Sequence, residues 1–143
     1  MGVEFGDIER YLDEQTKRLV RLKAFSTKSR NDFDEDRFSR DVGEFNFQII
    51  VQCCIDIAYR IIAIDNTRKS TDDYEAISLM GELGVLPVDL TCRMIRLIDF
   101  QNMLIYEYMS IDWDEVYSYL QNLDDLERFG LLVREWLVKR PVV

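Results

Sequence analysis

Four polar side chains on the helix predicted around residue 100 are of types that can take part in chemistry. Gln101 and Asn102 carry amides that donate and accept neutral hydrogen bonds, and Tyr106 and Tyr108 carry phenolic hydroxyls. A tyrosine with a pKa of about 10 is protonated at neutral pH and is a poor general base unless its environment is strongly perturbed. The sequence contains no histidine, so the commonest general base and the commonest metal ligand are both absent. We expect neither a metal nor another cofactor.

A second candidate pair is formed by Asp56 and Arg60, which lie four residues apart on a predicted helix that is otherwise almost entirely apolar. This spacing predicts an ion pair on the helix surface. We expect the pair to lie beside a groove that contains Gln101. The pair belongs to a line of polar residues that drifts around the helix by about 40° per step. The line consists of Gln48, Gln52, Asp56 and Arg60.

Charge and cysteine content restrict the possible partners. The 143 residues include 18 basic and 27 acidic side chains, which gives a net charge of −9. This charge opposes binding to duplex DNA or an anionic membrane by phosphate neutralisation, although a local basic patch remains possible. Cys53, Cys54 and Cys92 form no CxxC pair, which favours reduced thiols packed within helices and a cytoplasmic location. The N-terminal residues lack the features of a secretion signal, and no apolar run is long enough to span a membrane.

These side chains are expected to be positioned by helices alone. The chain has six glycines and two prolines, and its apolar residues recur at helical spacing. Thr71 is a predicted N-cap and Gly84 a predicted stop, with loops at 26–34 and 66–71. The pattern predicts an all-α, up-and-down helical bundle of four main helices and one short helix, in a single domain over residues 1–143. The predicted helices cover residues 7–25, 35–65, 72–83, 87–109 and 113–140.

The helix at 87–109 has two faces that differ in character. The face around Gln101 is an apolar stripe of Leu90, Met94, Leu97, Ile98, Leu104, Ile105 and Tyr108, and the second face carries Ile95, Asp99, Asn102, Tyr106 and Met109. Gln101 is either a tolerated polar residue in a groove that a partner covers, or a contact to nucleic acid. Tyr106 is either an interface aromatic or a catalyst.

Around these faces the sequence resembles the HepT-like branch of the HEPN superfamily. The resemblance rests on residues 75–87, 100–108 and 111–112, while residues 55–58 resemble the family's second-helix signature. It extends over about residues 7–137. The resemblance implies a HEPN-like bundle, a homodimer paired through this helix, and the activity of a metal-independent ribonuclease toxin.

The family motif can be placed residue by residue on this helix. In similar proteins it reads Arg-Asn, three residues, then His-x-Tyr. The family arginine falls on Gln101 and the family histidine on Tyr106, whereas Asn102 and Tyr108 match the motif as they stand. The resemblance therefore implies catalytic positions at Gln101, Asn102 and Tyr106. Arginine would stabilise charge on a phosphodiester and histidine would move the proton of a ribose hydroxyl, and glutamine and tyrosine replace both groups.

Tyr108 receives two different interpretations. The resemblance implies that it accepts adenylyl groups from a minimal nucleotidyltransferase antitoxin, whereas periodicity alone places it on the buried stripe. Two main functions stay open. One is a toxin whose RNA-cleaving motif is degenerate, and the other is a non-catalytic homodimer that binds a nucleotidyltransferase or a nucleotide. A generic structural bundle is a weaker third interpretation. The acidic charge favours a protein partner, and RNA remains a possible one.

Overall fold

A computed structural model describes residues 2–65 and 68–139, and within these ranges it contains helices and no strands, which confirms the all-α prediction. Four long helices form the body of the fold: α1 (Gly2–Lys23), α3 (Arg37–Asp65), α5 (Val88–Tyr106) and α7 (Asp124–Lys139). Three shorter helices connect them: α2 (Arg30–Glu35), α4 (Asp73–Glu82) and α6 (Trp113–Gln121). Two 3₁₀ turns complete the order, η1 (Ala24–Thr27) and η2 (Tyr108–Ser110).

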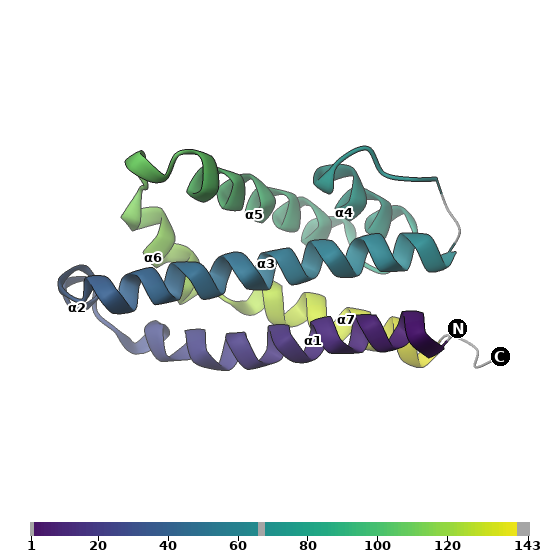
Figure 1. The fold of residues 1–143 in the computed structure, drawn as a ribbon, viewed down its shortest axis with the longest axis horizontal. Helices are drawn as coiled ribbons and strands as arrows, with labels where there is room; N and C mark the ends of the chain where they lie inside the picture. Colours follow the sequence, from purple (N-terminus) through teal and green to yellow (C-terminus); the bar gives the residue numbers. More distant parts are fainter. Residues whose placement is uncertain (1, 66–67, 140–143) are drawn as a thin grey trace.

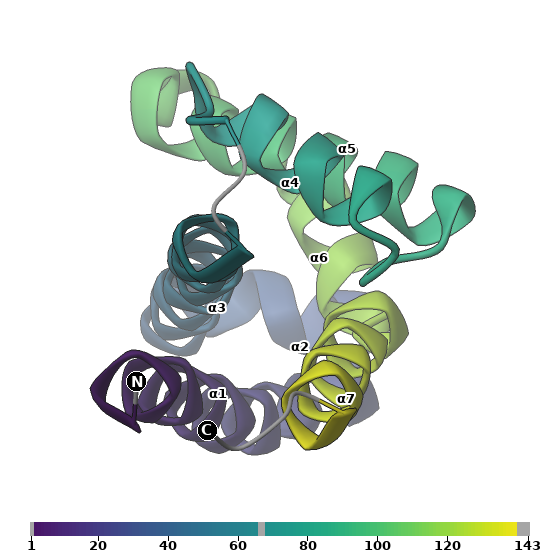
Figure 2. The same cartoon turned by 90° about the vertical axis from the view of Figure 1, so that its right-hand side faces the viewer.

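The long helices lie roughly side by side along the longest dimension of the molecule (Figure 1). Helix α3 runs through the middle, with α1 along one side of it and α4 and α5 along the other (Figure 1). The end view places α7 opposite α3, so that the long helices surround a shared interior (Figure 2). Helices α2 and α6 lie at one end of the bundle, whereas α1 begins and α7 ends at the other (Figure 1). This is the predicted up-and-down arrangement.

Two predicted features before α5 are wrong, and local hydrogen bonds explain both. The predicted loop at 26–34 contains α2, because the Ser29 side chain caps its first turn by accepting a hydrogen bond from the Asp32 N–H at 3.1 Å. The cap of α4 is Asp72 and not Thr71, since the Asp72 carboxylate accepts the Glu75 N–H at 2.8 Å. Residues 66 and 67 of the predicted linker lie outside the described residues.

Two helix ends after residue 87 also differ from the prediction. Helix α5 ends at Tyr106 rather than at residue 109, and Glu107 leaves helical geometry with φ −116° and ψ 38°. The predicted helix at 113–140 is two helices, because Asn122 leaves helical geometry with φ −128° and ψ 88°. The bundle therefore has three short helices instead of one. Residue 140, the predicted end of the last helix, lies outside the described residues.

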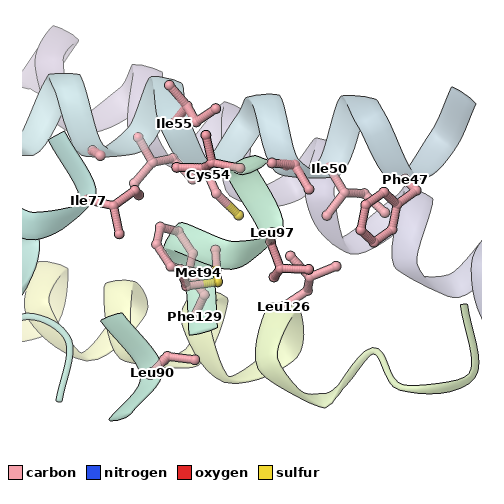
Figure 3. Close-up of a cluster of buried hydrophobic side chains, with 14 of the residues drawn as sticks. Phe47, Ile50, Cys54, Ile55, Ile77, Leu90, Met94, Leu97, Leu126 and Phe129 are labelled. Carbon is pink, nitrogen blue, oxygen red and sulfur yellow. The ribbon is translucent and has the colours of Figure 1, made fainter. Parts of the chain in front are cut away.

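Part of the hydrophobic core forms where α3, α5 and α7 meet (Figure 3). Helix α3 is long and apolar enough to cross a membrane by composition, but 56% of its most apolar window is buried inside the fold. That burial is the behaviour expected of a central core helix. Residues that fill the interior are Phe47, Ile50 and Cys54 of α3, Met94 and Leu97 of α5, and Leu126 and Phe129 of α7 (Figure 3).

The cysteines occupy two kinds of environment. Cys53 and Cys54 are buried on α3, as the sequence predicts, whereas Cys92 is exposed on α5 and its predicted place in the core is wrong. Burial raises the pKa of the Cys53 thiol to about 11 and that of Cys54 well above its ordinary value. The two buried cysteines are therefore protonated and act as small apolar residues.

A buried amide joins α1 to α3 and α7 at a close approach of helices. Gln15 is 1% exposed, and its Nε2 donates to the Cys54 Sγ at 3.1 Å and to the Leu126 carbonyl at 3.3 Å. Its Oε1 lies 2.9 Å from where a Cβ on Gly130 would stand. The absence of a side chain at Gly130 is thus what allows Gln15 to keep this position.

Substituting Gly130→Ala is expected to destabilise the protein by about 1–3 kcal/mol, because the new methyl group would displace a buried and hydrogen-bonded amide. Gly6→Ala is the matched control, since a Cβ there meets nothing within 4 Å. The control should be neutral or stabilising by up to about 1 kcal/mol, as alanine favours helix over glycine. Urea denaturation of both variants measures the difference, and equal stability of the two would contradict this role for Gly130.

Candidate functional site

The first motif position, Gln101, faces the interior of the bundle. Its side chain is 3% exposed, and its Nε2 donates to the backbone carbonyl of Gln48 on α3 at 3.0 Å. A buried amide without such a partner would be costly, so this bond fixes the side chain between the two helices. The expected position in a partner-covered groove is therefore wrong for the isolated protomer, as is direct access of nucleic acid. The family role of the position stays a prediction.

Asn102, the next residue, belongs to a hydrogen-bonded chain on the outer side of α5. Its Nδ2 donates to the Tyr74 hydroxyl at 2.8 Å, and that hydroxyl donates to the Asp99 Oδ1 at 2.7 Å. The hydrogen bond to Asp99 is the main reason that the pKa of Tyr74 is raised. The chain ties α4 to α5 and holds the Asn102 amide in one orientation.

Tyr106 and Tyr108 lie at the far end of α5 and are both exposed. Their exposed fractions are 79% and 68%, and Met109 beside them is 86% exposed. Helix α5 ends at Tyr106, so the helical period that places Tyr108 on the buried stripe does not continue to it. The core interpretation of Tyr108 is therefore wrong. Ile105, also expected on that stripe, is 44% exposed.

Asp56 and Arg60 do not form the predicted pair. Asp56 accepts a hydrogen bond from the Gln52 Nε2 at 3.0 Å, while Arg60 reaches α1 and pairs with Asp7 at 3.5 Å. The four-residue spacing leaves Asp56 and Arg60 within reach of one another, but each side chain engages a different partner, and that of Arg60 lies on α1. These two residues lie on one face of α3 but act separately.

The motif positions thus point in different directions within one protomer. Gln101 is bonded inside the bundle, Asn102 is fixed on its outer side, and Tyr106 and Tyr108 project at the end of the helix. Gln101 is an amide and Tyr106 a phenol, so neither side chain is a cation that could stabilise a phosphodiester. In residues 2–65 and 68–139 no group of three or more Cys, Asp or Glu side chains could hold a metal ion.

Sequence reasoning missed the residues that hold Asn102. Asp99 lies three residues before Asn102 on the same face of the helix, a spacing that could have indicated it. Tyr74 lies 28 residues away, at the start of α4, and no local pattern links it to α5. Its contact depends on how α4 packs on α5, which only the tertiary structure defines.

Solved structures share the helical fold of this chain, and a HEPN toxin is among them. An AMPylated HEPN toxin of Shewanella oneidensis, solved in complex with an MNT antitoxin, matches with a TM-score of 0.83 at 18% identity. The match covers 90% of this chain and 97% of that one. YutE, a cytosolic protein of unknown function from Bacillus subtilis, matches with a TM-score of 0.75 at 19% identity, over 96% and 94% of the two chains. At these identities the likeness concerns the fold.

The sequence itself places the chain in a particular family of this class. The profile of the ribonuclease HepT-like family matches residues 12–131, and the chain belongs to that family. A relative described as the tRNA nuclease HepT of Aphanizomenon flos-aquae is 28% identical over 128 residues. That alignment covers 90% of this chain and 81% of the relative. The expected HepT-like membership is confirmed.

Proposed function

We propose that this protein is the HepT-like component of a toxin–antitoxin pair, and that its own RNA-cleaving activity is weak or absent. The similar Shewanella toxin was solved with an MNT antitoxin and is described as AMPylated, which supports a minimal nucleotidyltransferase as the partner. The relative from Aphanizomenon flos-aquae is described as a tRNA nuclease, which supports tRNA as the RNA class to test as a substrate of this chain. The cytosolic description of YutE supports a cytoplasmic location.

The observation that carries the proposal is the state of Gln101. Cleaving RNA without a metal requires a group that removes the proton from the ribose 2′-hydroxyl and a group that stabilises the charged transition state. The motif position for charge stabilisation holds a neutral amide, 3% exposed and bonded to the Gln48 carbonyl. The position for the proton acceptor holds Tyr106, in a chain without histidine. Both chemical requirements are unmet at these positions.

A second candidate function is a non-catalytic homodimer that binds the nucleotidyltransferase or a nucleotide. The exposed Tyr106, Tyr108 and Met109 favour it, because large exposed side chains clustered at one helix end are typical of interfaces. The net charge of −9 also favours a protein partner over autonomous capture of RNA. In both candidate functions the end of α5 is the surface that contacts the partner.

The gene next to the one encoding this chain tests the partnership. We expect it to encode a small nucleotidyltransferase with paired metal-binding carboxylates, which copurifies with this protein when the two are expressed together. A neighbouring gene of another class, together with no copurification of any such transferase from the same genome, would contradict the proposed pairing. Neither result depends on whether RNA is cleaved.

We also propose that this protein forms a homodimer through the end of α5. Ile105 near the end of α5 and Met109 in η2, just beyond it, are 44% and 86% exposed. Light scattering should give twice the protomer mass of 17.0 kDa, and replacing both residues by serine should weaken the dimer by about tenfold or more. Val138→Ser is the matched control, because Val138 is 84% exposed on α7. A monomer of the unaltered protein at micromolar concentration would overturn this part.

A further inference from the structure

A small cavity between α5, α6 and α7 has no role in the proposed function. Its volume is about 170 Å³, and the polar side chains in its wall are Arg93, Arg96, Tyr119, Asn122 and Asp125. None of them is a motif position. Two guanidinium groups and one carboxylate therefore meet at one site of a protein whose net charge is −9.

Arg93 and Asp125 form an ion pair with each other. The Arg93 Nε donates to both carboxylate oxygens of Asp125 at 3.0 Å, and the Arg93 Nη2 donates to the Asp89 Oδ2 at 3.1 Å. The hydrogen bond to Asp125 is the largest cause that raises the pKa of Arg93, and the contacts with Asp89 add to it. The charge of the only carboxylate in the polar wall is thus balanced, and Arg93 is held rigidly in place.

Arg96 differs from Arg93 because it has no such partner. Its guanidinium is exposed and pairs with no carboxylate among residues 2–65 and 68–139. An arginine carries five N–H donors and stays charged at any physiological pH. Arg96 therefore brings to the cavity wall a positive charge that no ion pair engages, while the carboxylates of Glu115 and Asp99 act on the same site from a longer range.

Tyr119 and Asn122 add neutral donors beside it. The Tyr119 ring packs on Phe100 with centroids 4.4 Å apart and on Phe47 at 5.8 Å, which fixes its direction. Burial is the main cause that raises the pKa of Tyr119, and the negative charge of Glu115 adds to it, whereas the positive charge of Arg96 lowers it. The net effect is a raised pKa, so the hydroxyl keeps its proton. Neither this hydroxyl nor the Asn122 side-chain amide hydrogen-bonds to another of the described residues.

We propose that this cavity binds one phosphate ester group, with Arg96 as the charged ligand and Tyr119 and Asn122 as neutral donors. A phosphate group carries negative charge and several oxygens that accept hydrogen bonds, so it binds where a guanidinium and neutral donors lack other acceptors. Pockets that enclose whole small ligands measure about 300 Å³ or more, so this cavity suits a single phosphate with its ester group outside. The phosphate comes either from the terminal monoester of a nucleotide or from the backbone diester of single-stranded RNA.

Titration of the full-length protein with four probes at constant ionic strength tests the site. The probes are inorganic phosphate, uridine 5′-monophosphate, the dinucleotide UpU with its single internal diester, and uridine. We expect phosphate and at least one ester to bind and to shift the backbone amide resonances of residues 93–97 and 119–126, whereas uridine should not. A stronger response to the monoester identifies a terminal phosphate, and a response to UpU identifies the RNA backbone.

Three variants separate the site from general charge effects. Arg96→Gln should weaken phosphate binding by about tenfold or more, since hydrogen bonds to charged groups are the stronger class. Tyr119→Phe keeps the ring packing and removes the hydroxyl, and should weaken binding severalfold. Arg21→Gln, the same charge change at an exposed position of α1, should leave binding unaltered. Equal losses in Arg96→Gln and Arg21→Gln, or no phosphate binding at about 10 mM, would overturn the proposal.

Discussion

Replacing Gln101 by arginine and Tyr106 by histidine in the same chain is expected to raise metal-independent RNA cleavage by about 10²-fold or more. The histidine would supply a group that titrates near neutral pH, and the arginine would supply a positive charge for the transition state. Cleavage of tRNA in the presence of EDTA, followed on denaturing gels, measures the gain.

Each single substitution should stay near the level of the unaltered protein. The effects of catalytic residues that act as a unit on the rate are strongly non-additive. A base without the positive charge, or the charge without a base, should therefore raise the cleavage rate only slightly. The matched control is Gln101→Arg combined with Tyr106→Phe, which makes the same buried change without adding a base. If the properly folded double variant gained nothing over this control, the motif placement on Gln101 and Tyr106 would be wrong.

Adenylylation of Tyr108 is the second large effect that we expect. Incubation with the proposed nucleotidyltransferase partner, ATP and Mg²⁺ should place AMP on the peptide that contains Tyr108, and Tyr108→Phe should abolish it. The Tyr108 hydroxyl is well placed to act, because its side chain is 68% exposed and no described residue hydrogen-bonds to it. Its oxygen would attack the α-phosphorus of ATP, lose its proton, and release pyrophosphate. The added phosphate would oppose the approach of RNA through charge and bulk.

Two neighbouring tyrosines provide the controls for this assignment. Tyr117 is partly buried, and its hydroxyl donates to the Lys28 carbonyl at 2.5 Å, so it should stay unmodified. Tyr106 is 79% exposed and can compete, which makes Tyr106→Phe the variant that must retain the modification. Peptide mass spectrometry distinguishes the three tyrosines. AMP found only on Tyr106 or Tyr117 would refute the assignment and leave the partnership standing.

Most of the fold could be predicted from the sequence because the apolar period is strong in the long helices. The helix boundaries were harder, since side-chain caps and single residues decide them. Ser29 starts an unpredicted helix by capping it, and Asn122 divides a helix whose apolar pattern continues on both sides. Such local hydrogen bonds and backbone angles compete with periodicity and leave a weak trace in the sequence.

The sequence offers candidate positions through the family motif, but the geometry of those positions could not be predicted from it. The family motif indicates which positions matter, yet Gln101 is bonded inward and Tyr108 lies beyond the end of α5. A polar residue in the middle of an apolar stripe is compatible with either a groove or a buried bond to a carbonyl. The partner of Gln101 is a backbone atom 53 residues earlier, and no side-chain pattern encodes it.

Incubation of the unaltered full-length protein with a tRNA pool in EDTA tests the central claim most directly. Micromolar protein should leave the tRNA intact over the time in which the double variant cleaves it. The reason is that the protein has no histidine and that its motif glutamine is bonded to a backbone carbonyl. Rapid cleavage by the unaltered protein, purified free of contaminating nuclease and lost on Tyr106→Phe, would contradict the account and identify Tyr106 as a working catalyst.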